Sequence, residues 1–152
     1  MNKQELGVGD QAPPFDAVDT TGRRVSSKEW AGKNVVLYFY PKDDTPGCTK
    51  EACAFRDELP SLTQLGALVV GVSPDDAASH QRFVSKYQLN FTLLADEERK
   101  LCNLFGVSKK LFGIERTTFL INSKGRIAWI EKPVTVAGHV ERVTEALRSL
   151  VE

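Results

Sequence analysis

Two apolar segments on either side of a helical one constrain the fold of this chain more than any other feature. Residues 35–40 read Val-Val-Leu-Tyr-Phe-Tyr, and residues 67–72 read Ala-Leu-Val-Val-Gly-Val. Continuous apolar runs of this kind are typical of strands that are buried on both faces. Between them, apolar residues at helical spacing predict a helix that starts at Pro46 and passes through Leu62. The pattern predicts a parallel sheet covered by helices.

The other segments extend this unit at both ends. A small hairpin and one helical turn are expected before the first strand. After the second strand, the sequence predicts a helix, a short strand, a β-hairpin and a closing amphipathic helix. The first hairpin covers residues 10–26 and the helical turn residues 27–32. The later helix covers residues 75–87, the short strand 91–94, the β-hairpin 117–121 with 126–130, and the closing helix 140–150. The order is that of an α/β thioredoxin-like fold with an N-terminal hairpin extension. We expect a single domain over residues 1–152, in which Pro60 kinks or shortens its helix.

Composition excludes several classes of function. The chain carries 20 Lys and Arg against 20 Asp and Glu with no basic block, so neither nucleic acid nor an anionic membrane is an expected partner. The N-terminus is polar and no apolar run reaches membrane-spanning length, which predicts a cytoplasmic protein. Three cysteines are too few, and odd in number, for a disulfide scaffold. They are expected to be free thiols or a working pair.

Cys48 is a candidate reactive thiol because of its place in the chain. It follows the first buried strand and falls in the first turn of the helix that begins at Pro46. The unpaired N–H groups and partial positive charge of a helix N-terminus favour a thiolate over a thiol. Cys53 follows five residues later. A second thiol near an oxidised sulfur suggests thiol chemistry with a built-in second step.

The segment Pro41-Lys-Asp-Asp-Thr45-Pro-Gly-Cys48 fits the Pro-x-x-x-Thr-x-x-Cys motif of the peroxiredoxins. With Tyr-Phe-Tyr before it and Cys53 after it, this segment resembles the peroxiredoxin Q, or bacterioferritin comigratory protein, branch. The resemblance covers nearly the whole chain. It extends to residues 90–96, 105–107 and 116–121, the last matching the family's arginine-bearing strand. It implies a fold of the peroxiredoxin type, no cofactor, and a thiol-dependent peroxidase that reduces hydrogen peroxide and organic hydroperoxides in antioxidant defence.

Thiolate supply alone does not explain fast peroxide reduction. A free cysteine with a pKa near ~8.5 is already a few per cent thiolate, so full ionisation gains at most about 30-fold, or roughly 2 kcal/mol. Breaking the O–O bond also needs donors that stabilise charge on the oxygens. We assign these to the Thr45 hydroxyl, the N–H groups of Gly47 and Cys48, and Arg116, which would also hold the thiolate. Gly47 would leave room for the peroxide, and Pro41 would shield the sulfenic acid.

The resemblance implies that Cys53 resolves the Cys48 sulfenic acid as an intramolecular disulfide, and their spacing then predicts a conformational change. On an intact helix, Cα atoms five residues apart are roughly 8–9 Å apart with side chains about 140° apart, beyond the ~7 Å limit for a disulfide. We therefore expect the first turns after Pro46 to unwind. A thioredoxin-type dithiol would reduce the exposed disulfide and close the cycle.

Each of these residues has a simpler interpretation. Cys53 could pack in the core on the apolar face of its helix. Cys102 fits a small buried hydrophobe better than a redox role. His80 and His139 are expected at the surface, far in sequence from either cysteine.

Competing functions are judged on the same residues. A disulfide reductase of the thioredoxin type needs Cys-x-x-Cys where this chain has Thr45-Pro-Gly-Cys48. A metal site needs three or four ligands at close spacing, and the cysteines and histidines are scattered along the chain. A redox sensor, or a chaperone-like binding module that uses the same thiol switch, stays open. We expect a monomer, because no extension follows the last helix to carry a resolving cysteine to a partner.

Overall fold

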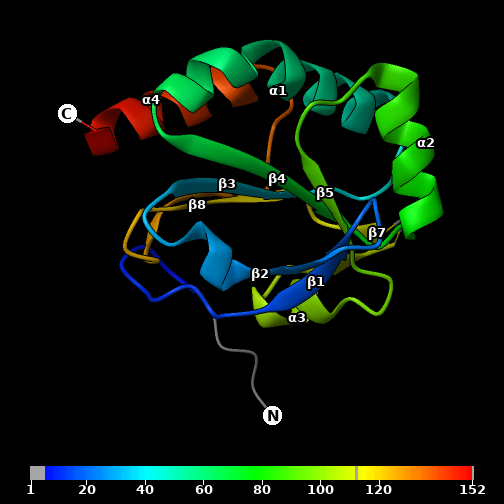
Figure 1. The fold of residues 1–152 in the computed structure, drawn as a ribbon, viewed down its shortest axis with the longest axis horizontal. Coiled ribbons are helices and arrows are strands. Elements are labelled where there is room, and N and C mark those ends of the chain that lie inside the picture. The colour runs from blue at the N-terminus through cyan, green and yellow to red at the C-terminus, as the bar shows by residue number, and fades with distance from the viewer. Residues whose placement is uncertain (1–5, 112, 152) are drawn as a thin grey trace.

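In the computed structural model, which describes residues 6–111 and 113–151, a seven-stranded mixed sheet lies between two layers of helices and loops (Figure 1). The strands are β1 (Asp16–Asp19), β2 (Arg24–Ser26), β3 (Asn34–Phe39), β4 (Ala67–Ser73), β5 (Thr92–Ala95), β6 (Lys109–Lys110), β7 (Gly113–Ile114), β8 (Thr117–Ile121) and β9 (Ile127–Glu131). The helices are η1 (Ser27–Trp30, a 3-10 helix), α1 (Pro46–Gln64), α2 (Ala77–Tyr87), α3 (Lys100–Leu104) and α4 (His139–Val151).

The strand order in the large sheet is β2-β1-β5-β4-β3-β8-β9. β3 and β4 pair in parallel, as do β4 and β5, whereas β8 and β9 add antiparallel strands beside β3. The predicted N-terminal hairpin is confirmed, and β1 also pairs with β5, so the hairpin extends the edge of the sheet. None of the helices in the described parts of the chain is long and apolar enough to cross a membrane.

The central strand β3 is buried on both faces, as its sequence predicted. Val36, Tyr38 and the following Tyr40 pack on the side covered by α1, α2 and α4. Val35, Leu37 and Phe39 face the opposite layer, which contains α3 (Figure 1). Because β3 runs through the middle of the molecule, the loop that follows it, and the N-terminus of α1 after that loop, have a rigid support.

The helix α1 continues through Pro60 to Gln64, so the expectation that Pro60 shortens it was wrong. Proline lacks the N–H that would bond to the carbonyl of residue 56. The side-chain amide of Asn90 takes its place and donates to the Arg56 carbonyl at 3.2 Å. Arg56 in turn donates through Nη1 to the carbonyl of Tyr87 at 2.7 Å. Two contacts therefore fasten the second half of α1 to the segment at the end of α2.

Cys102 lies in α3, a short helix that the sequence analysis did not predict. The carboxylate of Asp96 accepts hydrogen bonds from the N–H groups of Leu101 and Cys102, at 2.9 and 3.0 Å, and so caps this helix. Burial, followed by the contact with Asp96, raises the pKa of the Cys102 thiol far above its ordinary value. The thiol stays protonated, which agrees with its prediction as a small buried hydrophobe.

Candidate active site

Cys48 lies in the first turn of α1 and is only 1% exposed. Pro46 also lies in the first turn, where a backbone N–H would have no partner within the helix, so proline loses no helical hydrogen bond there. The first helical bond runs from the N–H of Thr49 to the carbonyl of Thr45 at 2.8 Å, so the N–H groups of Gly47 and Cys48 precede the helical ladder. The sulfur is therefore in a position that stabilises negative charge.

Arg116 contacts the Cys48 sulfur across the active site. Its Nη2 donates to Sγ at 3.1 Å, and its Nη1 donates to Oε1 of Glu51 at 3.0 Å. The backbone of Arg116 is fixed as well, because its carbonyl accepts a hydrogen bond from Val134 at 3.0 Å. Residues far apart in the sequence thus form one charged group around the sulfur. Glu51 fixes the guanidinium and Val134 fixes the backbone of Arg116, so the guanidinium can stabilise a thiolate without a change in its position.

Gly47 has a packing role beside Arg116 that the sequence did not reveal. A Cβ atom at this position would lie 2.7 Å from Nη2 of Arg116. That separation is shorter than a van der Waals contact, so a larger residue would displace the guanidinium from the sulfur. The glycine makes room for Arg116, and its expected second role, to leave room for the peroxide, stays a prediction.

The other two residues predicted in the motif, Thr45 and Pro41, line an open hollow beside the start of α1. The Thr45 hydroxyl donates to the carbonyl of Lys42 at 2.9 Å, and in the described parts of the chain it makes no hydrogen bond to Cys48. Pro41 is partly buried. An open hollow of about 440 Å³ lies beside both, and its lining includes Arg99 and Gly113. The structure therefore brings Cys48, Arg116 and Gly47 together, whereas Thr45 and Pro41 line the neighbouring hollow.

Cys53 is partly buried on the same unbroken helix, and both it and Cys48 are free thiols. Five residues along an intact helix separate the two Cα atoms by roughly 8–9 Å. A disulfide needs less than ~7 Å. The structure is thus the conformation that precedes any bond between these cysteines.

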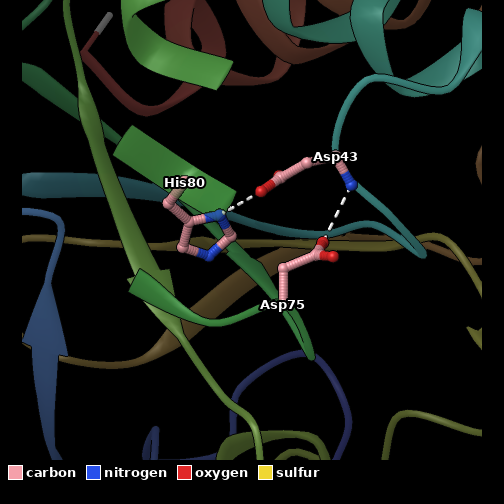
Figure 2. Close-up of side chains that lie close together, drawn as sticks. All are labelled: Asp43, Asp75 and His80. Atoms are coloured by element: carbon pink, nitrogen blue, oxygen red, sulfur yellow. Dashed lines mark hydrogen bonds and ion pairs between the residues drawn. The ribbon is translucent and has the colours of Figure 1, made fainter. Parts of the chain in front are cut away.

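The loop between β3 and α1 is anchored by a buried cluster around Asp43 (Figure 2). One carboxylate oxygen of Asp43 accepts from the Tyr40 hydroxyl at 2.6 Å; the other contacts Nδ1 of His80 at 2.7 Å and accepts from Ser79 at 2.8 Å. The N–H of Asp43 donates to Asp75 at 2.8 Å. Nothing in the sequence analysis had assigned a role to these residues.

His80 is completely buried, so its prediction as a surface residue was wrong. Its Nε2 lies 2.9 Å from the carbonyl of Leu94. Because a carbonyl only accepts, Nε2 must carry a proton. Burial alone would lower the pKa of His80, but the hydrogen bond and negative charge of Asp43 outweigh burial and raise it. The spacing of His80 with Phe83, Val84 and Tyr87 follows one face of a helix and could have revealed its burial.

The side chains of Asp43, Asp75 and His80 are the group in the described chain that could hold a metal ion. Their ligand atoms all lie within 4.8 Å of one another. In this structure they bind protein groups instead, with Nδ1 of His80 on Asp43 and the Asp75 carboxylate on the Asp43 N–H and the Ser73 hydroxyl. A cation would have to displace the proton between His80 and Asp43.

Glu51 and His139 were missed as members of the site. Glu51 is buried one turn after Cys48, and that spacing places both on one face of α1. His139, the first residue of α4, is 1% exposed, so its surface prediction was also wrong. Its ring meets Phe55 edge-on, and its Nδ1 lies 3.1 Å from Oε2 of Glu51. Its four-residue spacing to Val143 was the available signal.

A thioredoxin-like sheet that presents a buried cysteine at a helix N-terminus, against an arginine, defines a thiol-dependent peroxidase. The AhpC/TSA family model matches residues 8–130 of this chain. Peroxiredoxin Bcp of Bacillus subtilis is 42% identical over 154 residues, which cover 97% of this chain and 98% of that protein. The chain belongs to the AhpC/TSA family, in its peroxiredoxin Q branch, as the motif predicted.

Solved structures agree with this assignment. A PrxQ mutant of Xylella fastidiosa has a TM-score of 0.92 at 34% identity, with 98% of this chain and 99% of that chain covered. The bacterioferritin comigratory protein of Xanthomonas campestris, studied for alkyl peroxide reduction, has a TM-score of 0.87 at 35% identity, with 91% and 92% covered. The predicted thioredoxin-like fold is confirmed.

Proposed function

We propose that Cys48 is the peroxidatic nucleophile, that Cys53 resolves its sulfenic acid, and that a thioredoxin-type dithiol reduces the resulting disulfide. The observation that carries the proposal is the contact of 3.1 Å between Nη2 of Arg116 and the buried Cys48 sulfur, at the N-terminus of α1. A thiolate held in this way can attack a peroxide oxygen while the same guanidinium and the free N–H groups face the developing charge.

The reaction balances in three steps. The Cys48 thiolate attacks one oxygen of the hydroperoxide, the O–O bond breaks, and the leaving oxygen takes up a proton, giving sulfenic acid and water or an alcohol. The Cys53 thiol then displaces that hydroxyl as water and forms the disulfide. A dithiol finally reduces the disulfide through a mixed disulfide and is itself oxidised.

Both hydrogen peroxide and organic hydroperoxides are proposed substrates. The open hollow beside Pro41 and Thr45 supports this, because it leaves space next to the first turn of α1 for a substituent on the peroxide. The alkyl peroxide reduction studied in the Xanthomonas campestris relative supports it as well. We also propose a monomer in the cytoplasm, where an odd number of cysteines, three in this chain, suits a reducing compartment.

The resolving step requires α1 to unwind between the two cysteines, and amide exchange measures this. We expect residues 46–56 to lose protection in the disulfide form, while the protection of β3 and β4 is unchanged. Identical protection of residues 46–56 in the reduced and oxidised proteins would contradict the proposed resolution by Cys53.

A peptide map of the reduced protein after one equivalent of hydrogen peroxide tests the assignment of the cysteines. We expect a disulfide between Cys48 and Cys53, with Cys102 left as a thiol. Linkage through Cys102, or thiols throughout, would overturn the proposal. Repeated additions of peroxide with a recycling dithiol then distinguish an enzyme, which turns over many times, from a redox sensor, which reacts once.

A further inference from the structure

The buried polar atoms that lack a hydrogen-bond partner gather around the active site. Within the described residues they belong to four side chains, Tyr38, Glu51, Thr118 and His139. Tyr38 and Thr118 lie opposite each other in the β3–β8 register. Burial, and then the charges of Glu51 and Cys48, raise the pKa of Tyr38. Native interiors leave few such atoms, so their concentration beside the reactive sulfur calls for a functional explanation.

Three contacts connect α4 to the Cys48 sulfur. Nδ1 of His139 lies 3.1 Å from Oε2 of Glu51, Oε1 of Glu51 lies 3.0 Å from Nη1 of Arg116, and Nη2 of Arg116 lies 3.1 Å from Sγ of Cys48. The first contact has the distance of an ion pair but not the alignment of a hydrogen bond.

The charges in this chain of contacts explain why Glu51 needs His139. A Cys48 thiolate and a Glu51 carboxylate bring two negative charges to a buried site, against one positive charge on Arg116. A carboxylate oxygen only accepts hydrogen bonds, so Nδ1 of His139 is the atom of this pair that could donate one to Glu51. The other carboxylate near His139, Glu131, is already bound by Nε and Nη2 of Arg142, each at 2.7 Å.

We infer that His139 is a positioning residue for the Cys48 reaction: from the first residue of α4 it orients the Glu51 carboxylate, which in turn holds Arg116 against the sulfur. This inference rests on the proposed function. It goes beyond the cysteine and arginine chemistry, because it assigns part of the reactivity of Cys48 to a side chain on α4.

The same contact has a second effect, of opposite sign, on the resolving step. Glu51 lies between Cys48 and Cys53, in the turn that must unwind before they can join. His139 therefore favours the folded helix in which peroxide reacts and opposes the unwound one in which the disulfide forms. Loss of the contact should slow the oxidation of Cys48 and speed the formation of the disulfide.

Two variants of His139 separate its polar role from its packing. His139→Phe keeps an aromatic ring against Phe55 but removes both nitrogens. His139→Asn removes the ring but keeps an N–H donor near the position of Nδ1. Oxidation of Cys48 by hydrogen peroxide, measured in a single turnover by rapid quench and mass spectrometry, should slow about 10-fold in His139→Phe and less than about 3-fold in His139→Asn. Disulfide formation should be faster than wild type only in His139→Phe.

Val143→Ala is the matched control, because Val143 is buried on the same helix and its side chain neither donates nor accepts a hydrogen bond. It should lower the unfolding free energy and leave the oxidation rate within about 2-fold of wild type. If His139→Asn is slow and His139→Phe is normal, the role of His139 is packing and the inference is wrong. If wild-type Cys48 does not react with peroxide at all, the proposed function fails instead.

A measurement on the histidine rings tests the inference even if these variants fold poorly. The chain contains two histidines, so nitrogen NMR can follow each ring separately. Replacing the thiolate in Cys48→Ser should shift the ring-nitrogen signals of His139, which communicates with the sulfur through Glu51 and Arg116. The signals of His80, whose nitrogens contact Asp43 and the Leu94 carbonyl, should stay in place. An unchanged His139 spectrum would overturn the inference.

Discussion

Two buried histidine–carboxylate pairs flank the start of α1, and they differ in how completely their atoms are bonded. In the closed cluster, which consists of Tyr40, Asp43, Asp75, Ser79 and His80, both carboxylate oxygens of Asp43 and both ring nitrogens of His80 have partners. In the open cluster, which consists of Cys48, Glu51, Arg116 and His139, one oxygen of Glu51 and both ring nitrogens of His139 have no aligned hydrogen bond to residues 6–111 or 113–151.

The difference separates an anchor from a reactive site. A fully bonded polar cluster stabilises one arrangement and resists change. A polar cluster with incomplete hydrogen bonding keeps atoms that can form new hydrogen bonds when the charge on the sulfur changes. The chain therefore places a fixed support on one side of the first turn of α1 and an adjustable group on the other.

The largest expected effect is on stability, from breaking the closed cluster. Asp43→Ala leaves His80 buried without its carboxylate partner, and the loss of one member of a buried pair costs about 3–5 kcal/mol. Chemical denaturation should show this loss. Asp57→Ala is the matched control, because Asp57 pairs with Arg56 at the surface and such pairs contribute about 0–1 kcal/mol. Equal losses in the two variants would mean that the cluster is not an anchor.

The next largest effect is on catalysis, from breaking the open cluster. Arg116→Met removes the donor that faces the sulfur and the peroxide, so the rate of Cys48 oxidation should fall about 100- to 1,000-fold. Stopped-flow kinetics with hydrogen peroxide would measure it. Arg23→Met, which removes an exposed arginine bound to Glu29, should leave the rate unchanged. A fully active Arg116→Met protein would remove Arg116 from the mechanism.

The smallest effect is the pH dependence of the closed cluster. Because the pKa of His80 is raised in the folded protein, the cluster contributes its full stability below the ordinary histidine pKa of ~6.5 and loses it as pH rises through the folded pKa. The difference in unfolding free energy between wild type and His80→Gln should therefore shrink as pH rises. A difference that is constant across this pH range would show that His80 is not protonated in the folded state.

Much of the fold follows from local sequence patterns. Buried strands, amphipathic helices and turn residues predicted the central strands, α1, α2, the β8–β9 hairpin and α4. Two small elements escaped. The helix α3 depends on a cap from Asp96, and the β6–β7 pair has two residues in each strand, too few for a recognisable period. The prediction for Pro60 failed because Asn90, which is distant in sequence, donates to the Arg56 carbonyl that Pro60 cannot bond.

The candidate site was predictable where one segment carries it and not where distant segments meet. Cys48, Thr45 and Gly47 share a single motif, and Arg116 was found through the family resemblance. His80 and His139 were misjudged because histidine is intermediate between the buried and the exposed residue types, so its type alone does not decide its burial. Their burial is decided by carboxylates on other segments, Asp43 and Glu51. Helical spacing to apolar neighbours was the usable signal in both cases.

The two contacts that fasten Arg56 to the segment after α2 have a consequence for how far a rearrangement of α1 can spread. Arg56 lies less than one turn beyond Cys53, and its side chain and carbonyl are bound by Tyr87 and Asn90. Unwinding that begins at Pro46 meets this fixed point directly after Cys53. Under the proposed mechanism, Cys53 would therefore stay in place while Cys48 moves toward it, and the remainder of α1 would keep its packing against the core.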